Sequence, residues 1–356
     1  MLRDLTIKNY RAFKDFSIDG LARVNLIVGS NNAGKTSFLE AVYLLANQGS
    51  PAVLLQLLDK RGEFTISQGP PSKIEYDTAH LFHDFQLNID QLRPKDMISI
   101  TSSTSSQDEE LSVHFKVTDR RSSLGFQQPG LQIDAAYSTP NGEAALALDI
   151  GGTYLFSSDT RFTANNRPPS RYHFVGTEID SSDYLAILSD RVFQVPSDKE
   201  AVLRLMRLIE PQLEDIILQS SQTAGRFILR RLDSDLRLPI SSAGEGLRRV
   251  FALALHSIVS AQGVLLIDEI DTGLYYRSQA DVWRLLFKAA KERDIQIFAT
   301  THSWDCVEAF QEALAEGDNA EQGYLFRLQR RGDRIYPVGY TSDDLNVAVR
   351  QAIEVR

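Results

Sequence analysis

The feature that most constrains the fold is an eight-residue glycine loop. Residues 29–36 read Gly-Ser-Asn-Asn-Ala-Gly-Lys-Thr. An apolar run at 24–28 precedes this loop, and helical spacing follows it at 36–47. A strand, a tight loop and a helix in this order turn backbone N–H groups and the positive end of the helix toward an anion. The pattern therefore predicts a phosphate-binding loop in an α/β fold.

Different residues of the loop are expected to contact different parts of a nucleotide. Gly29 and Gly34 let N–H groups turn toward phosphates. We expect Lys35 to reach the β- and γ-phosphates, which makes it a catalytic candidate, and the Thr36 hydroxyl to bind Mg²⁺. The predicted ligands are ATP and Mg²⁺. The predicted nucleotide contacts cover Gly29, Ser30, Asn31, Asn32, Ala33, Gly34, Lys35, Thr36 and Ser37.

A second motif is the apolar run 264–267, which ends in Asp268 and Glu269. Parallel strands in such folds bind ligands at their carboxyl ends. We expect Asp268 to hold Mg²⁺ through water and Glu269 to act as the general base toward the attacking water. The alternative is a strand that ends in a solvated acidic pair.

A third motif is the run of small residues at 241–246, which lies just before a stretch with helical spacing. They would offer N–H groups and a hydroxyl to an anion. A plain cap is also compatible, with Ser242 as N-cap and Glu245 three residues later as a capping box. After the apolar stretch 295–300 comes His302, which is expected to contact the γ-phosphate or the attacking water. The alternative is a structural histidine.

Composition excludes several classes of protein. A hydrophobic content of 43% and a net charge of −9 are those of an ordinary soluble globular protein without a general nucleic-acid-binding charge. The single cysteine excludes an internal disulfide. No signal peptide and no membrane span is evident, so a cytoplasmic protein without a membrane partner is expected. An arginine-rich stretch at 226–249 makes DNA a candidate ligand, with a solvated or protein-binding face as the alternative.

Together these motifs resemble ABC-type ATPases. The opening 7–14 is similar to RecF- and SMC-type proteins, and the ending 343–356 to stand-alone relatives of OLD-family ATPases. Ser242 and Gly244 match the serine and second glycine of the ABC signature, whereas Ala243 and Glu245 depart from it. The resemblance also implies an interface loop near Asp271.

The resemblance implies an α/β P-loop fold of the ABC-ATPase head type. Its mostly parallel sheet would be flanked by helices and joined by an antiparallel β subdomain and a helical insertion. We expect residues 1–50 and 226–356 to form the head and residues 51–225 to form an inserted β-rich and helical subdomain.

In that family ATP is sandwiched between two heads, so the resemblance implies a homodimer or a higher oligomer. Arg11 would approach the nucleotide, and Ser242, Gly244 and Glu245 would contact the nucleotide of the other copy. The implied role is control of a separate nuclease or effector in anti-phage defence or DNA repair. The alternatives are an ATP-binding scaffold or sensor with little turnover, which holds a partner protein, and the ATPase of a transport system.

Overall fold

The computed structural model describes most of the chain, in nine stretches. They are residues 1–66, 74–85, 97–105, 110–119, 131–139, 142–149, 171–178, 180–220 and 225–356. The chain folds into two compact units. The first unit comprises Met1–Leu21, Asn31–Pro168 and Leu328–Val338, and the second comprises Ala22–Ser30, Pro169–Arg327 and Gly339–Arg356.

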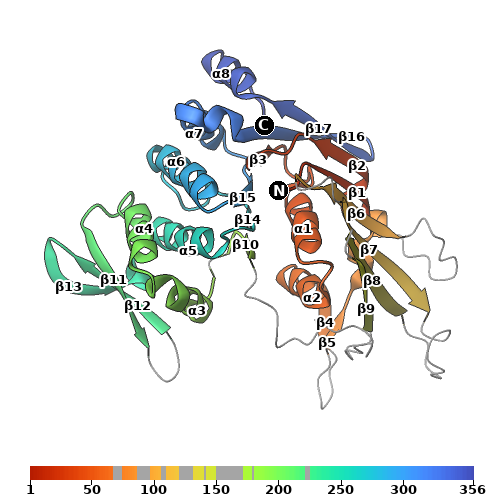
Figure 1. Ribbon diagram of the computed structural model, residues 1–356, viewed down its shortest axis with the longest axis horizontal. Coiled ribbons are helices and arrows are strands. Elements are labelled where there is room, and N and C mark those ends of the chain that lie inside the picture. Colours follow the sequence, from red (N-terminus) through yellow and green to blue (C-terminus); the bar gives the residue numbers. More distant parts are fainter. Residues whose placement is uncertain are drawn as a thin grey trace. The chain divides into compact units, whose positions relative to one another are not determined.

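The second unit is organised around a six-stranded sheet in the order β10-β14-β15-β3-β16-β17 (Figure 1). Pairing is parallel from β10 through to β16. Every residue of the three short strands β14, β15 and β3 is buried, as expected for a parallel sheet covered on both faces. The strands are β10 (Tyr172–Val175), β14 (Val264–Ile267), β15 (Gln296–Thr300), β3 (Val24–Val28), β16 (Gly323–Arg331) and β17 (Arg334–Tyr340).

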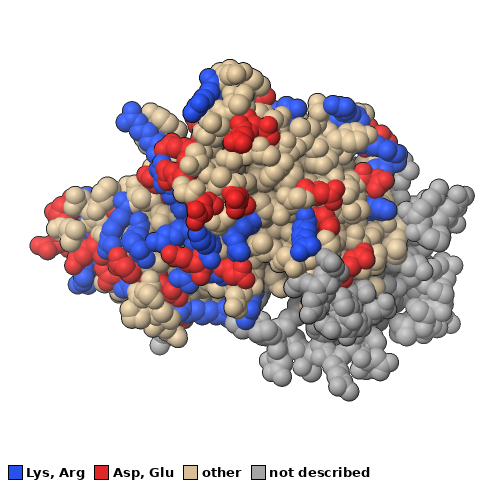
Figure 2. All heavy atoms as spheres, turned by 45° about the horizontal axis from the view of Figure 1, so that its top comes forward, with Lys and Arg blue, Asp and Glu red and all other residues tan. Residues whose placement is uncertain are grey.

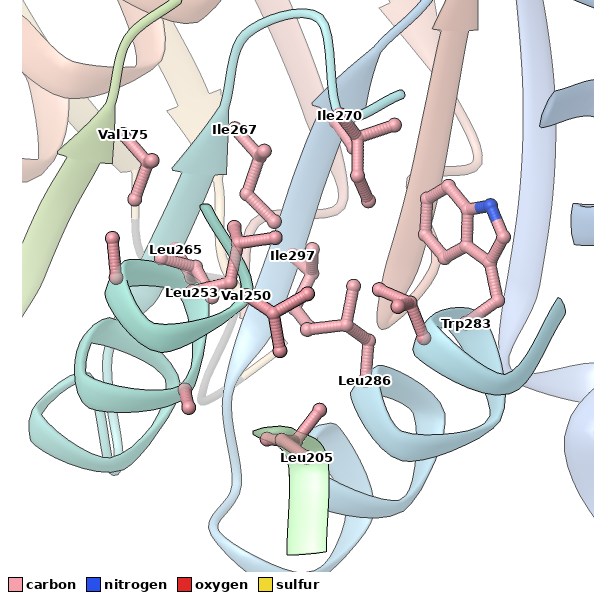
Figure 3. Packing of buried hydrophobic residues seen from close by; sticks show 14 of the residues in the cluster. Val175, Leu205, Val250, Leu253, Leu265, Ile267, Ile270, Trp283, Leu286 and Ile297 are labelled. Atoms are coloured by element: carbon pink, nitrogen blue, oxygen red, sulfur yellow. The ribbon is translucent and has the colours of Figure 1, made fainter. Parts of the chain in front are cut away.

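The described residues of this unit form six α-helices. They are α3 (Ser182–Phe193), α4 (Pro196–Met206), α5 (Glu245–Val259), α6 (Tyr276–Glu292), α7 (Trp304–Leu314) and α8 (Ser342–Arg350). Figure 3 shows Val250 and Leu253 of α5 and Leu286 of α6 directed toward Leu265 and Ile297 of the strands. Alternating strands and helices thus produce the predicted α/β layer.

A three-stranded antiparallel sheet also belongs to the second unit. It consists of β11 (Leu213–Ser220), β12 (Gly225–Arg231) and β13 (Ser234–Pro239). Residues 197–219 show helical spacing, which correctly predicts α4 but is wrong for 213–219. Leu213 and Ile216 are buried in β11, where pairing with β12 overrides the local helical spacing.

The first unit contains a six-stranded antiparallel sheet in the order β2-β1-β6-β7-β8-β9. Two helices and a small two-stranded sheet accompany it. The elements are β1 (Asp4–Tyr10), β2 (Phe13–Asp19), β6 (Ile98–Ser103), β7 (Glu110–Asp119), β8 (Leu131–Thr139), β9 (Gly142–Asp149), α1 (Lys35–Ala46), α2 (Pro51–Lys60), β4 (Phe64–Ile66) and β5 (Ile74–Tyr76). This sheet confirms the antiparallel part of the expected fold.

One sequence expectation in this unit is wrong. The serine- and threonine-rich stretch 97–106 predicts a solvated loop, but Ile98–Ser103 forms β6 between β1 and β7. Its burial alternates, with Ile98, Ile100 and Ser102 inside. The hydroxyl of Ser102 is accommodated there because it donates to the carbonyl of Asp4 at 2.6 Å. The Asn, Pro and Ser residues of 162–172 predict another loop. Much of that stretch lies outside the described residues.

The division of the chain into a head (1–50 and 226–356) and an inserted subdomain (51–225) stays a prediction. The two compact units are defined by packing and do not test it. Within the stretches of chain described here, no helix is long and apolar enough to cross a membrane.

Candidate nucleotide-binding site

The glycine loop joins β3 to α1 as the sequence predicts. Asn32 and Gly34 adopt positive φ angles of 61° and 91°. A Cβ at Gly34 would come within 3.1 Å of Phe13 and Ile335, so glycine is needed there for space as well as for its backbone. Gly34 caps α1 without a side-chain hydrogen bond, and the first turn carries no acidic residue. Both features suit a helix start that receives an anion.

The remaining loop residues are distributed over both units. Gly29 and Ser30 belong to the second unit, and the chain enters the first unit at Asn31. Ala33 and Ser37 are buried, whereas Lys35 and Thr36 are partly exposed at the start of α1. These are the positions from which an ammonium group and a hydroxyl would meet phosphate and Mg²⁺.

Three neighbouring parallel strands of the second unit end at one edge of the sheet. In the order β14-β15-β3, they are followed by Asp268, by Thr301 and by Gly29 respectively. The Thr301 N–H donates to the Ile27 carbonyl at 3.2 Å. The structure thus places the beginning of the glycine loop, the acidic pair and the predicted histidine at the same edge, where ligands of such sheets bind.

Asp268 is held by a threonine that sequence reasoning missed. The fully buried Thr300 donates from Oγ1 to Asp268 Oδ1 at 2.5 Å and accepts from the Glu269 N–H at 2.9 Å. No cluster of three or more His, Cys, Asp or Glu side chains within the described residues would hold a metal by itself. A carboxylate such as Asp268 is a ligand type that suits Mg²⁺, which typically completes its shell with water and substrate phosphates. A Mg²⁺ site formed by Asp268 and Thr36 stays a prediction.

Glu269 and His302 lie beside each other. His302 Nδ1 is 3.7 Å from Glu269 Oε1, and their side chains are 53% and 39% exposed. Thr272 donates weakly to the other carboxylate oxygen of Glu269, at 3.4 Å. A carboxylate that is open to solvent and next to an imidazole is arranged to accept a proton from water.

The small-residue segment 241–246 differs from the capping interpretation. Ser242 ends a short 3₁₀ turn, and Gly244 is the N-cap of α5, with no side-chain cap. The capping-box reading of Ser242 and Glu245 is therefore wrong. Ser242, Gly244 and Glu245 are all exposed. The helix start is left open to solvent by its small residues.

Asp271 and Arg11 have partners within the chain. The Asp271 carboxylate accepts a short hydrogen bond from Thr301, so its role at an interface stays a prediction. Arg11 is buried in the first unit, where its guanidinium pairs with Glu63 at 2.7 Å and Glu40 at 2.8 Å. Because both carboxylates already bind the guanidinium, the structure shows no nucleotide contact by Arg11, and that contact stays a prediction.

Three arginines of the arginine-rich stretch are paired with acids or buried. Arg230 pairs with Glu214, and Arg231 pairs with Asp233. Arg249 is 2% exposed. Figure 2 shows positive and negative side chains interspersed over the visible face. These three arginines are therefore not free to bind phosphate, and DNA binding by the stretch stays a prediction.

Known proteins resemble the chain over most of its length. Residues 24–305 match the family described as "AAA domain, putative AbiEii toxin, Type IV TA system". An ATP/GTP phosphatase of Helicobacter pylori is 24% identical over 97% of both chains. An OLD nuclease of Thermus scotoductus is 22% identical over 85% of this chain, which spans 59% of that nuclease. RecF of Bacillus cytotoxicus is 40% identical over 45 residues, 13% of this chain and 12% of RecF.

Solved structures agree on the fold. An SMC head bound to the C-winged helix domain of ScpA has a TM-score of 0.54 at 13% identity, with 98% of this chain and 99% of that chain covered. An SMC head with an extended coiled coil, bound to the C-terminal domain of ScpA derived from Pyrococcus furiosus, has a TM-score of 0.51 at 11% identity, with 99% of each chain covered. These likenesses confirm the expected head-type fold.

Proposed function

The chain belongs to this AAA domain family, and from that premise we propose that it hydrolyses ATP as one member of a nucleotide-sandwiching dimer. The observation that carries the proposal is the shared edge of β14, β15 and β3, where Glu269 lies 3.7 Å from His302 and the glycine loop begins. The full-length likeness to an ATP/GTP phosphatase supports the same chemistry.

Each residue then has a defined task. The loop N–H groups and Lys35 bind the phosphates, and Thr36 and Asp268 hold Mg²⁺. The bound ion would neutralise charge on the phosphate oxygens. Glu269 accepts the proton of the attacking water, and His302 orients that water or contacts the γ-phosphate.

The exposed start of α5 supports the proposed dimer. Ser242 and Gly244 are exposed, and no side chain caps the helix, so its N–H groups can receive an anion from a second copy. In this arrangement ATP acts as a conformational ligand that favours the closed dimer, and hydrolysis releases it.

We further propose that the closed dimer controls a separate nuclease or effector in anti-phage defence or DNA repair. The likeness to an OLD nuclease supports a nuclease partner. The SMC heads, each bound to a domain of ScpA, support a protein partner for a head of this fold.

Three variants test the ATPase. Lys35→Ala should lose nucleotide binding, whereas Glu269→Gln should bind ATP, hydrolyse it slowly and accumulate as a dimer. Glu321→Gln, an exposed glutamate away from the sheet edge, is the control and should behave as wild type. Hydrolysis by Glu269→Gln at the wild-type rate would show that Glu269 is not the base.

Turnover by the wild-type protein separates the alternatives. Tight ATP binding with negligible hydrolysis, with and without DNA, would favour a scaffold or sensor. Co-purification of a membrane protein would favour the ATPase of a transport system. Light scattering with and without ATP tests the dimer, and a monomer in both conditions would contradict it.

A further inference from the structure

Arg249, in the second turn of α5, is a buried cation with main-chain partners. It is 2% exposed, and its guanidinium donates to the carbonyls of Gly176, Asp268 and Glu269, the last two at 2.7 and 3.4 Å. Burial lowers the pKa of Arg249, although several nearby carboxylates oppose that shift. A charge is kept in such a place only when its hydrogen bonds compensate for lost hydration.

Two of these carbonyls belong to the peptide groups on either side of Glu269. That residue has a φ angle of 45°, in the left-handed region that glutamate rarely adopts. Such a conformation persists only when its surroundings enforce it. Arg249 holds the peptide on each side, and Thr300 accepts the N–H of Glu269 at 2.9 Å. The Thr272 N–H also donates to the Glu269 carbonyl, at 3.0 Å. Arg249, Thr300 and this backbone turn together set the direction of the Glu269 side chain.

Arg249 also connects this conformation to the exposed start of its own helix. Segment 241–246 leads directly into α5. A Cβ at Gly246 would come within 2.6 Å of the Gly273 carbonyl, so the helix start is packed tightly on the loop after Glu269. A displacement of the start of α5 would consequently move the guanidinium relative to the two carbonyls.

We propose that Arg249 is a positioning residue, which holds Glu269 in the geometry for hydrolysis and makes that geometry depend on what segment 241–246 contacts. This inference rests on the proposed ATPase function and deepens it. A contact made by a second copy at segment 241–246 thereby reaches the general base of the same chain through one side chain.

The test uses two variants, Arg249→Lys and Arg249→Ala. Arg249→Lys keeps the positive charge but loses the planar guanidinium that donates to several carbonyls at once. Both should bind ATP like wild type while kcat falls about 100-fold, the effect expected when a catalytic group shifts by about 1 Å. Added guanidinium, well below denaturing concentrations, should partly restore kcat in Arg249→Ala. The control is Arg284→Met, which removes an arginine with three carboxylate partners on the α6 surface and should leave kcat unchanged.

Hydrogen exchange provides a readout that needs no catalysis. In nucleotide-free protein, the amides of residues 264–274 should exchange faster in Arg249→Lys than in wild type or Arg284→Met. Unchanged amide exchange in Arg249→Lys would overturn the inference, and so would a wild-type kcat in that variant. A loss of ATP binding as large as the loss of kcat would also overturn it. If wild type itself does not hydrolyse ATP, the proposed function fails, while the exchange result still decides whether Arg249 holds Glu269.

Discussion

Replacing Thr300 with valine tests how the acidic pair is held. Valine has nearly the shape of threonine, so Thr300→Val removes two hydrogen bonds without leaving a cavity. The Glu269 N–H loses its acceptor, and Asp268 Oδ1 loses its donor. Thr300 has no exposed surface, so water cannot replace the hydroxyl there. The variant therefore isolates the hydroxyl from the packing of the side chain.

The expected cost follows from these two bonds. A buried neutral bond contributes about 1 kcal/mol, and a bond to a charged acceptor contributes about 1.5–3 kcal/mol. Together they predict that Thr300→Val lowers the free energy of unfolding by about 3 kcal/mol. Thr300→Ser keeps both bonds and loses one buried methyl group, so its loss should be about 1 kcal/mol.

Tryptophan fluorescence during denaturant unfolding measures this difference selectively. The two tryptophans, Trp283 and Trp304, both belong to the second unit, as does Thr300. A Thr300→Val protein as stable as Thr300→Ser would refute the reasoning. ATP hydrolysis should fall in the same order, because Glu269 loses one of the bonds that fix its backbone.

Three further predictions concern other parts of the chain. Glu40→Gln should destabilise the first unit by about 1.5–3 kcal/mol in denaturant unfolding, since it removes one of the two carboxylate partners of buried Arg11 and leaves Glu63 as the other. A loss no larger than that of exposed Asp333→Asn would contradict this. Burial, reinforced by Asp271, raises the pKa of Cys306 to about 12, so the thiol stays protonated below that pH. It should resist Ellman's reagent at pH about 8.5 until the protein unfolds, and rapid native labelling would disprove it. Thr341→Ala should cost about 1 kcal/mol by removing the capping box of α8, seen as faster amide exchange at 342–350. Hydrogen bonds from Thr341 lower the pKa of Asp344, so this cap is present at neutral pH and weakens only as pH falls through that lowered value.

Much of the second unit could be predicted because its signals are local. The runs 24–28 and 264–267 are short and largely apolar, with Asn25 as the one polar residue, and each is followed by residues of distinctive chemistry. Parallel pairing then brings their carboxyl ends to one edge, which is why Glu269 and His302 could be placed together. β6 and β11 could not be predicted this way, since each depends on pairing with strands distant in the chain.

The partners of Arg249 and Arg11 could not be predicted from the sequence for the same reason. Arg249 stands among other arginines in the sequence, and only its place on the apolar face of α5, with Val250 and Leu253 beside it, indicates burial. Arg11 pairs with a carboxylate 52 residues away, in Glu63. No spacing rule connects such partners, so their pairing emerges only when the fold is complete.

The position of β3 has a consequence for how the protein is made. β3 is formed by residues 24–28, but its neighbours β15 and β16 begin at Gln296 and Gly323. A ribosome releases the apolar segment of β3 long before either neighbour exists, and non-local pairing of this kind is slow. The nascent chain must keep this segment from aggregating until both of these partner strands have been synthesised. A chain that stops before Gln296 would lack both strands that pair with β3, and the glycine loop would have no paired strand before it.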